Sequence, residues 1–204
     1  NRFITYSYAC IGQEDWNDNT NIELLQKEFY KFVNVEKADY IVDSCNESLA
    51  NKVGIVEKSK NEIYGCSNVG TVLLTSDINL ENCTKRQSEF ERQYLYQYIY
   101  NLYKKISLKK LNYDFEKKSK SAKEEFIKFA QTTWIEEITN DNLGSLLQNE
   151  WTKTLKMDAI FKQVKNKYDL LYKNLIYPFI PKSCSLFLTV RKFSFCFSSF
   201  PIMP

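Results

Sequence analysis

Apolar residues in the middle of the chain recur with two competing periods. In QYLYQYIYNLYKK, residues 93–105, tyrosine falls on every second position, which is typical of a strand. Over a longer window the apolar residues recur every three or four positions, and they continue after the alternation ends. This helical stripe consists of Phe90, Tyr94, Leu95, Tyr98, Ile99, Leu102 and Ile106. The longer pattern therefore predicts a helix over about 85–112.

The charges around this stripe favour the same interpretation. Glu89 and Glu91 lie at its amino end, and Lys104, Lys105, Lys109 and Lys110 lie at its carboxyl end, as the helix dipole prefers. We interpret the four lysines as a solvated helix end. This interpretation is preferred to a nucleic-acid site, and no nucleic-acid partner is expected.

A second helix is predicted over about 120–138. Ser121 and Glu124 have the spacing of a capping box, in which the hydroxyl accepts from the third backbone N–H and the carboxylate reaches back. Trp134 and Ile138 would extend this helix. Its expected apolar face comprises Phe126, Phe129, Ala130 and Thr133.

A third helix, over about 143–175, has the most regular pattern. Its apolar residues step alternately by four and three positions, which is the a/d pattern of a coiled coil or helical bundle. They are Met157, Phe161, Val164, Tyr168, Leu171 and Leu175. A stripe of this length requires a partner helix, either from this chain or from another copy.

Residues 1–80 predict a small mixed sheet with helices. FITYSYACI (3–11) alternates as a strand does, and IELLQKEFYKFV (22–33) has a helical face after a possible capping box at Thr20. That face comprises Ile22, Leu25, Phe29, Phe32 and Val33. Two short strands around a charged turn are predicted within 52–65, and a buried strand over 70–77. The fold class expected is α+β (α/β), a small sheet followed by three long helices, the last of them stalk-like.

The pattern divides the chain into three parts: a small α/β subdomain (1–80), a long-helix region (81–175) and a tail (176–204). The tail holds all four prolines and no acidic residue, and it has lost any clear period. We expect it to be unstructured or non-native. The chain begins with Asn rather than Met, so we expect a fragment of a longer protein.

Composition narrows the possible functions. Four of the 28 basic residues follow Asp169 and none of the 25 acidic ones does, so the body is nearly neutral. The chain has no histidine, which excludes Ser/His/Asp and Cys/His nucleophile pairs, and it has no phosphate-loop motif. Its six cysteines include no Cys-x-x-Cys pair, and reduced thiols are favoured over a disulfide framework. We therefore expect no enzyme, no catalytic residue and no bound cofactor.

Three segments resemble the cytoplasmic domain of bacterial CorA-like divalent-cation transporters. They are FERQYLYQYIYNLYKKISLKKL (90–111), FIKFAQTTWIEEITNDNLGSLLQNEWTKTLKM (126–157) and IFKQVKNKYDLLYKNL (160–175). The resemblance implies an α/β domain followed by long helices, the last of which leads to the membrane in a homo-oligomer. The Gly-Met-Asn pore signature of that family is absent, so no conducting residue is assigned.

The resemblance further implies a non-catalytic, regulatory domain on the cytoplasmic face of the cell membrane, connected to the membrane by a downstream segment. Mg²⁺ or another divalent cation would be its regulatory ligand, and homo-oligomerisation would use the C-terminal helix. Asp141 and Asp158 are examples of carboxylates that could contact such a cation, because hard cations prefer oxygen ligands. Plain surface exposure is the preferred interpretation of either residue, and neither is assigned as a metal site. The alternative is a helical protein-interaction module with no role in transport.

Overall fold

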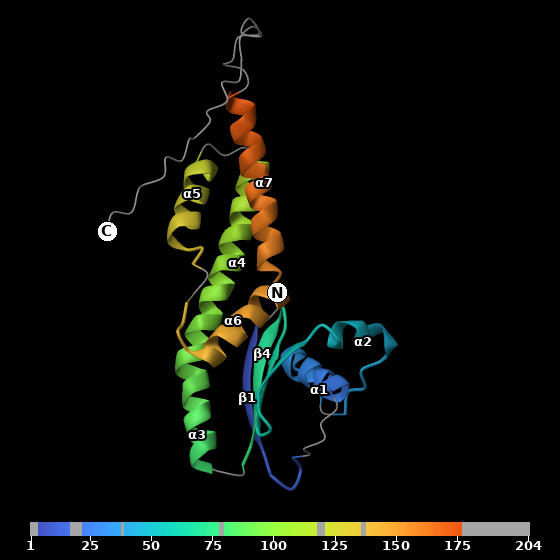
Figure 1. The fold of residues 1–204 in the computed structure, drawn as a ribbon. Helices are drawn as coiled ribbons and strands as arrows, with labels where there is room; N and C mark the ends of the chain where they lie inside the picture. The colour runs from blue at the N-terminus through green and yellow to red at the C-terminus, as the bar shows by residue number, and fades with distance from the viewer. Residues whose placement is uncertain are drawn as a thin grey trace, which may run out of the picture. The chain divides into compact units, whose positions relative to one another are not determined.

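The structure is a computed structural model, and it describes residues 4–16, 22–37, 39–77, 80–117, 121–135 and 138–176. The first part of the chain contains strands and helices, and every described element after β4 is helical (Figure 1). In chain order they are β1 (Thr5–Ile11), α1 (Ile22–Asn34), α2 (Ser44–Ala50), β2 (Gly54–Ser59), β3 (Glu62–Cys66), β4 (Gly70–Ser76), α3 (Leu80–Glu89), a π-helical turn (Phe90–Tyr94), α4 (Leu95–Glu116), α5 (Ala122–Thr132), α6 (Asn142–Thr154) and α7 (Met157–Ile176). The predicted α+β class is confirmed.

The described strands form a four-stranded mixed sheet in the order β1-β4-β3-β2. β1 pairs with β4 in parallel, whereas β2 with β3, and β3 with β4, are antiparallel. The predicted strands over 3–11, 52–65 and 70–77 are therefore confirmed. Because β4 lies inside the sheet and is covered on both faces, all seven of its residues are buried.

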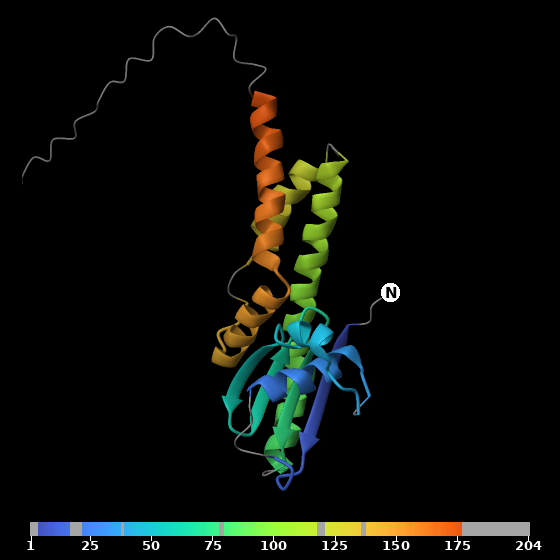
Figure 2. The same ribbon diagram turned by 90° about the vertical axis from the view of Figure 1, so that its right-hand side faces the viewer.

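The two faces of the sheet carry separate cores. Phe29 of α1 packs with Ile63, Val72 and Leu74 on one face. On the other face, Tyr64 and Leu73 pack against the helical region, with a core that also contains Phe90, Tyr94, Tyr98, Leu143, Leu147 and Trp151. The alternation of neighbouring strand residues between these cores explains why β3 and β4 are apolar without interruption. Figure 2 shows α1 and α2 on one side of the sheet and α4 on the other.

Close approach of α1 to the sheet depends on a glycine. A Cβ added at Gly65 would lie 2.6 Å from the ring of Phe29, closer than real contacts allow. Val33 is buried beside Phe29, but Phe32, predicted on the same helical face, is 39% exposed. The 3.6-residue period places Phe32 at the margin of the packed face, which explains this error. The short helix α2 was not predicted; Asp43 caps it by accepting from the Asn46 N–H at 2.9 Å.

The first predicted long helix is longer than expected and is not regular throughout. It begins as α3 at Leu80, passes through the π-helical turn, and continues as α4 to Glu116. The hydroxyl of Tyr6 donates to the Phe90 carbonyl at 2.7 Å, and the two rings stack with centroids 4.0 Å apart. The Phe90 carbonyl, which also accepts from the Leu95 N–H, thus receives a second hydrogen bond from β1.

The lysines expected at a helix end lie in the middle of α4, because the helix continues beyond them. Lys104 is buried, and its Nζ donates to the Ile135 carbonyl at 2.5 Å and lies 5.4 Å from the Trp134 ring centroid. The prediction of a solvated end is wrong for Lys104. It holds better for Lys109 and Lys110, which are exposed.

The second predicted helix is shorter than expected. α5 ends at Thr132, so Trp134 follows the helix instead of extending it. The Ser121 hydroxyl makes no capping hydrogen bond, so the predicted capping box is wrong; Ser121 bonds to the carboxylate of Glu125 instead. Phe126 and Phe129 are buried as predicted.

The third predicted helix is two helices, α6 and α7, separated at Leu155 and Lys156. Lys156 has a φ of 57°, a left-handed conformation that ends the first helix. No Gly or Pro lies near Lys156 to indicate the break. The break lets Trp151 and Leu155 enter the core on the sheet, with the Trp151 indole N–H donating to Thr71 Oγ1 at 2.9 Å.

Residues up to Tyr168 form one compact unit, and Asp169 begins a second. The core on the helical face contains residues from both sides of the division predicted near residue 80. Thr20 and the predicted tail after residue 176 lie outside the described residues.

Candidate functional site

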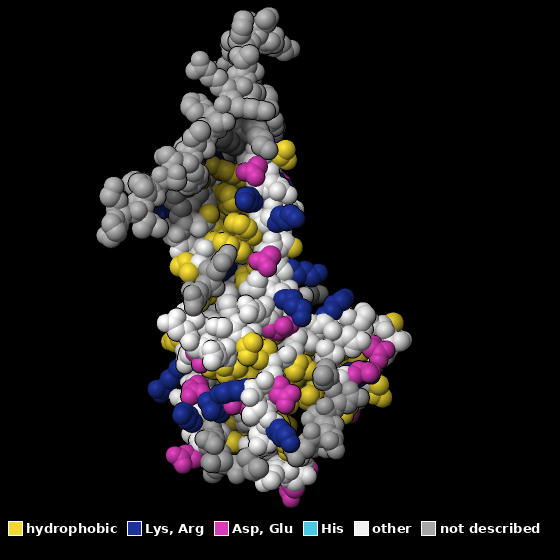
Figure 3. Space-filling view, in the orientation of Figure 1, with side chains coloured by type: hydrophobic (Ala, Val, Ile, Leu, Met, Phe, Trp, Pro, Cys, Tyr) yellow, Lys and Arg dark blue, Asp and Glu magenta, His cyan; other side chains and the backbone are white. Residues whose placement is uncertain are grey.

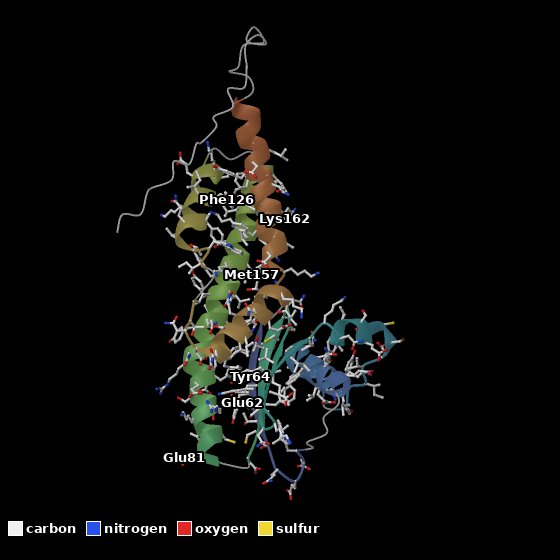
Figure 4. All side chains as sticks on the ribbon, in the orientation of Figure 1. Glu62, Tyr64, Glu81, Phe126, Met157 and Lys162 are labelled. Atoms are coloured by element: carbon white, nitrogen blue, oxygen red, sulfur yellow. The ribbon has the colours of Figure 1, made fainter. Side chains whose placement is uncertain are left out.

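A buried carboxylate lies where β3 meets α3 (Figure 4). Glu62 accepts from the Tyr64 hydroxyl at 2.6 Å and pairs with Arg86 at 3.1 Å and with Lys58 at 3.4 Å. Burial raises the pKa of Tyr64, so the phenol remains a protonated donor. The two cations offset the charge of Glu62, and the network joins the sheet to α3. Its groups satisfy one another, as in a structural ion pair.

Asp141, one of the two carboxylates considered for a cation, caps α6. Its Oδ2 accepts from the Gly144 N–H at 2.8 Å and from the Tyr94 hydroxyl at 2.9 Å. The Gly144 N–H holds the pKa of Asp141 below its usual range. Asp158, the other candidate, lies in the first turn of α7 and is exposed. The carboxylate of Asp141 is thus engaged in capping, a role that the sequence pattern did not predict.

Two further findings concern metal sites and membrane-spanning helices in the described part of the chain. Within it, no three His, Cys, Asp or Glu side chains come together in a way that could hold a metal ion. Nor does any described helix combine the length and the apolar character needed to cross a bilayer.

A groove of about 1410 Å³ lies over the α1 side of the molecule. It is lined by α1, α2, β2 and the carboxyl end of α6. Its charged lining consists of Lys52, Lys60, Lys153, Lys156, Glu57 and Glu150. Four of these side chains are lysines and two are glutamates, and Lys153 pairs with Glu150 at 3.2 Å. The charged lining therefore has an excess of two lysines over glutamates, and this ion pair neutralises part of it.

The apolar stripe of α7 packs against other segments of the same chain. We call Met157, Phe161, Val164 and Tyr168 the α7 seam, the part of the predicted stripe that lies in the first compact unit. Phe161 stacks on Trp134 with centroids 4.2 Å apart, and Tyr168 packs on Phe126 at 5.0 Å. Figure 3 shows hydrophobic side chains gathered between α5 and α7. The partner that this stripe requires thus comes, as far as Tyr168, from α4, α5 and the segment after α5.

A second stripe, on α4, is not filled. We call it the α4 seam: Tyr96, Ile99, Tyr103, Ile106 and Tyr113. Their exposed fractions run from 49% at Ile99 to 72% at Tyr96. They step by three, four, three and seven positions, and Lys110 occupies the intermediate a/d position. In Figure 2 the upper part of α4 has α7 on one side and no described strand on the other.

The opposite side of α4 is buried and partly polar. Asn101 Nδ2 donates to Gln148 Oε1 at 2.7 Å, and Gln148 Nε2 donates back to Asn101 Oδ1 at 2.8 Å. Gln97 Nε2 donates to the Gly144 carbonyl at 2.8 Å. These bonds hold α4 on α6 in one orientation, because the amides would otherwise be buried without partners. The α4 seam is thereby held pointing outward.

The apolar pattern of the sequence did not predict this surface. It placed Ile99 and Ile106 on the same stripe as Phe90, Tyr94 and Tyr98, but the structure buries the latter three and exposes both isoleucines. The spacing of Tyr96, Ile99, Tyr103 and Ile106 was available as a signal. It was obscured because α4 is apolar around most of its circumference.

Comparison with known proteins provides no further guidance. No family model, curated protein or solved structure matches this chain significantly.

Proposed function

We propose that this chain is a non-catalytic interaction domain that binds a second copy of itself through the α4 seam. The exposed a/d spacing of the seam on a rigidly held helix carries this proposal. The spacing is that of a helix that packs against another helix. Its tyrosines also favour an interface, because an aromatic ring supplies a large contact area at low entropic cost.

The size of the seam suits a dimer. Its five side chains expose roughly 600 Å² of surface in each copy, given the usual area of an aromatic or aliphatic side chain. A standard interface buries roughly 800 Å² per partner. Flanking residues such as Lys109 and Leu102 supply the remainder. An exposed apolar patch of this size exceeds what scattered surface residues account for.

Charge selects the direction of pairing. In a parallel pair, Lys110 would face Lys110 of the other copy. The exposed ion pair of Lys110 with Glu125, at 3.2 Å, would offset only part of the repulsion between the two ammonium groups. In an antiparallel pair related by a two-fold axis, Tyr103 of one copy faces Ile106 of the other and Lys110 faces Ile99. Tyr96 then faces Tyr113. Antiparallel pairing thus joins the whole seam without placing Lys110 opposite Lys110.

The second candidate function is the cytoplasmic domain of a CorA-like divalent-cation transporter. It is favoured by the order of the elements, a mixed sheet followed by helices that end in the long helix α7, together with the sequence resemblance over 90–111, 126–157 and 160–175. The two functions predict different pairings. Since α4 runs in the same direction as α7, subunits whose α7 helices all lead to one membrane would bring their α4 helices together in parallel.

Sedimentation velocity over a range of concentrations tests self-association, and cysteine cross-linking tests its direction. Cross-linking uses the full chain with Cys10, Cys45, Cys184 and Cys196 replaced by Ser. A mixture of Tyr103→Cys and Ile106→Cys proteins should form the mixed disulfide dimer in preference to either homodimer. A monomer at all concentrations would overturn the proposal.

The direction in which two α4 helices pair distinguishes the two candidate functions. Preferential cross-linking of Tyr103→Cys to itself would indicate parallel pairing, which contradicts the antiparallel dimer and supports the transporter. A matched control is Lys128→Cys, because Lys128 is exposed on α5 and lies outside the α4 seam. This variant should form far less dimer under the same conditions.

A further inference from the structure

Two cysteines that are distant in the sequence lie in contact where β1 ends and α3 begins. Cys10 belongs to β1 and Cys83 to the first turn of α3. Their Sγ atoms are 3.2 Å apart, although 73 residues separate them along the chain. Because a disulfide requires the two side chains to approach each other in this way, few cysteine pairs meet the geometric requirement by chance.

The two thiols differ in their access to solvent. Cys10 is exposed, whereas Cys83 is 5% exposed. The Cys83 thiol donates to the Ser76 carbonyl at 2.9 Å, and the Tyr8 hydroxyl donates to the Cys83 carbonyl at 3.3 Å. These contacts hold Cys83 beside Cys10. A reagent in solution therefore reaches Cys10 first, and Cys83 is the second sulfur within reach.

We propose that Cys10 and Cys83 form a site of reversible covalent modification, which low-molecular-weight disulfides convert to an intramolecular disulfide. The Cys10 thiolate attacks one sulfur of the reagent, forming a mixed disulfide and releasing half of the reagent as a thiolate. Cys83 then loses its proton and attacks the Cys10 sulfur, displacing the other half as a second thiolate. Two electrons pass from the cysteines to the reagent. The two thiolates take up the two protons that the cysteines lose.

The disulfide would fasten an edge of the sheet to the helical layer. β1 is an edge strand of the described sheet, paired on one side with β4. Edge strands are open to local separation and to pairing with other chains. A covalent link to α3 restricts both. This inference is independent of the proposed dimer, because neither cysteine belongs to the α4 seam.

The experiment uses the full chain and glutathione disulfide as the probe. After incubation the remaining thiols are alkylated, the protein is digested without reductant, and the peptides are identified by mass spectrometry. We expect the peptide that contains Cys10 to be joined to the one that contains Cys83, with loss of alkylation at both and recovery of both thiols in dithiothreitol. A lasting glutathione adduct on Cys10 with Cys83 fully alkylated would overturn the proposal. So would a link from Cys10 to another cysteine.

Two variants test the order of the steps. The Cys83→Ser protein should retain a glutathione adduct on Cys10, because no second sulfur is available to displace it. A folded Cys83→Ser protein that resolves this adduct as fast as the wild type would contradict the proposed role of Cys83. Cys45→Ser is the matched control, since Cys45 is also exposed, and it should leave the Cys10–Cys83 link unchanged. If Cys83→Ser does not fold, the wild-type peptide map decides the question by itself.

Discussion

The α4 and α7 seams have the same spacing of apolar residues and different surroundings. On α7 the residues pack against aromatic rings from elsewhere in the chain, and Val164 is fully buried. On α4 the equivalent positions are about half exposed or more. Both helices are amphipathic along part of their length, yet only one of these stripes contributes to the core of its own chain.

The difference shows that a/d spacing indicates a contact surface without identifying the partner. The α7 seam is completed by Trp134, which follows α5, and by Phe126 within it. The α4 seam lies on the far side of a helix whose inner face is already occupied by α6 and the sheet. A helix with two apolar faces in a small domain has one face left for another molecule.

Among the substitutions by Ala, the largest expected effect is on α7. Replacing Phe161 with Ala removes the ring stacked on Trp134 and leaves a cavity beside Phe126, so we expect the free energy of unfolding to fall by about 3 kcal/mol. Urea denaturation followed by circular dichroism measures this change. A loss below about 1 kcal/mol would mean that the α7 seam is not packed in solution, and the contrast with α4 would disappear.

On α4 the expected effect is on association. Placing a carboxylate in the proposed interface with Ile106→Asp should weaken dimerisation about 30-fold, which corresponds to about 2 kcal/mol. The stability of the monomer should change by less than about 0.5 kcal/mol, because Ile106 is 62% exposed. Sedimentation and urea denaturation measure the two quantities separately.

A matched substitution on the same helix sharpens this test. Leu108 is fully buried, so Leu108→Asp should unfold the protein or abolish its cooperative transition. Similar destabilisation by Ile106→Asp and Leu108→Asp would show that both sides of α4 are packed within the monomer. That result would remove the surface on which the proposed function rests.

A smaller effect is expected where the inner side of α4 meets α6. Asp141→Ala removes the cap of α6 and the partner of the Tyr94 hydroxyl, and should cost about 1 kcal/mol. Asp141→Asn should cost less, because Asn is also a good N-cap. The free energy of unfolding at neutral pH compares the three proteins.

The ionisation of Asp141 predicts that the stability of the fold depends on pH. The pKa of Asp141 is lower in the folded protein than its ordinary value of 3.8. The ionised form of Asp141 therefore stabilises the fold at pH values above its ordinary pKa. This stabilisation is lost as the pH falls through the lower pKa of the folded protein. The Asn variant should lose less stability than the wild type on acidification in this range. Identical acid profiles for the two proteins would contradict the capping role.

The smallest effect is expected on the outer side of α7. Lys165 is exposed, so Lys165→Ala should change the free energy of unfolding by no more than about 0.3 kcal/mol. Thermal melts of the Lys165→Ala and Phe161→Ala proteins provide the comparison. Equal losses of stability from Phe161→Ala and Lys165→Ala would mean that burial of the α7 seam does not account for the stability that Phe161 contributes.

Local pattern predicted many of the elements correctly and several of their boundaries incorrectly. The strand over 70–77 was recognisable because a run of β-branched and apolar residues between turn signals fits a strand buried on both faces. The division of the third helix at Lys156 was not recognisable, since no Gly or Pro marks it. The burial of Lys104 was equally hidden, because it depends on the Ile135 carbonyl and the Trp134 ring, which lie about 30 residues away.

The sequence by itself determined the class of the fold and the periodicity of its helices, because hydrophobic spacing and turn residues act over a few neighbouring positions. Only the tertiary structure decided which side of α4 faces the core, that the α7 seam is filled by Phe126 and Trp134, and that Cys10 meets Cys83. These outcomes depend on which segments compete for the same apolar surface once the chain is compact. Such competition between distant segments leaves no local pattern in the sequence.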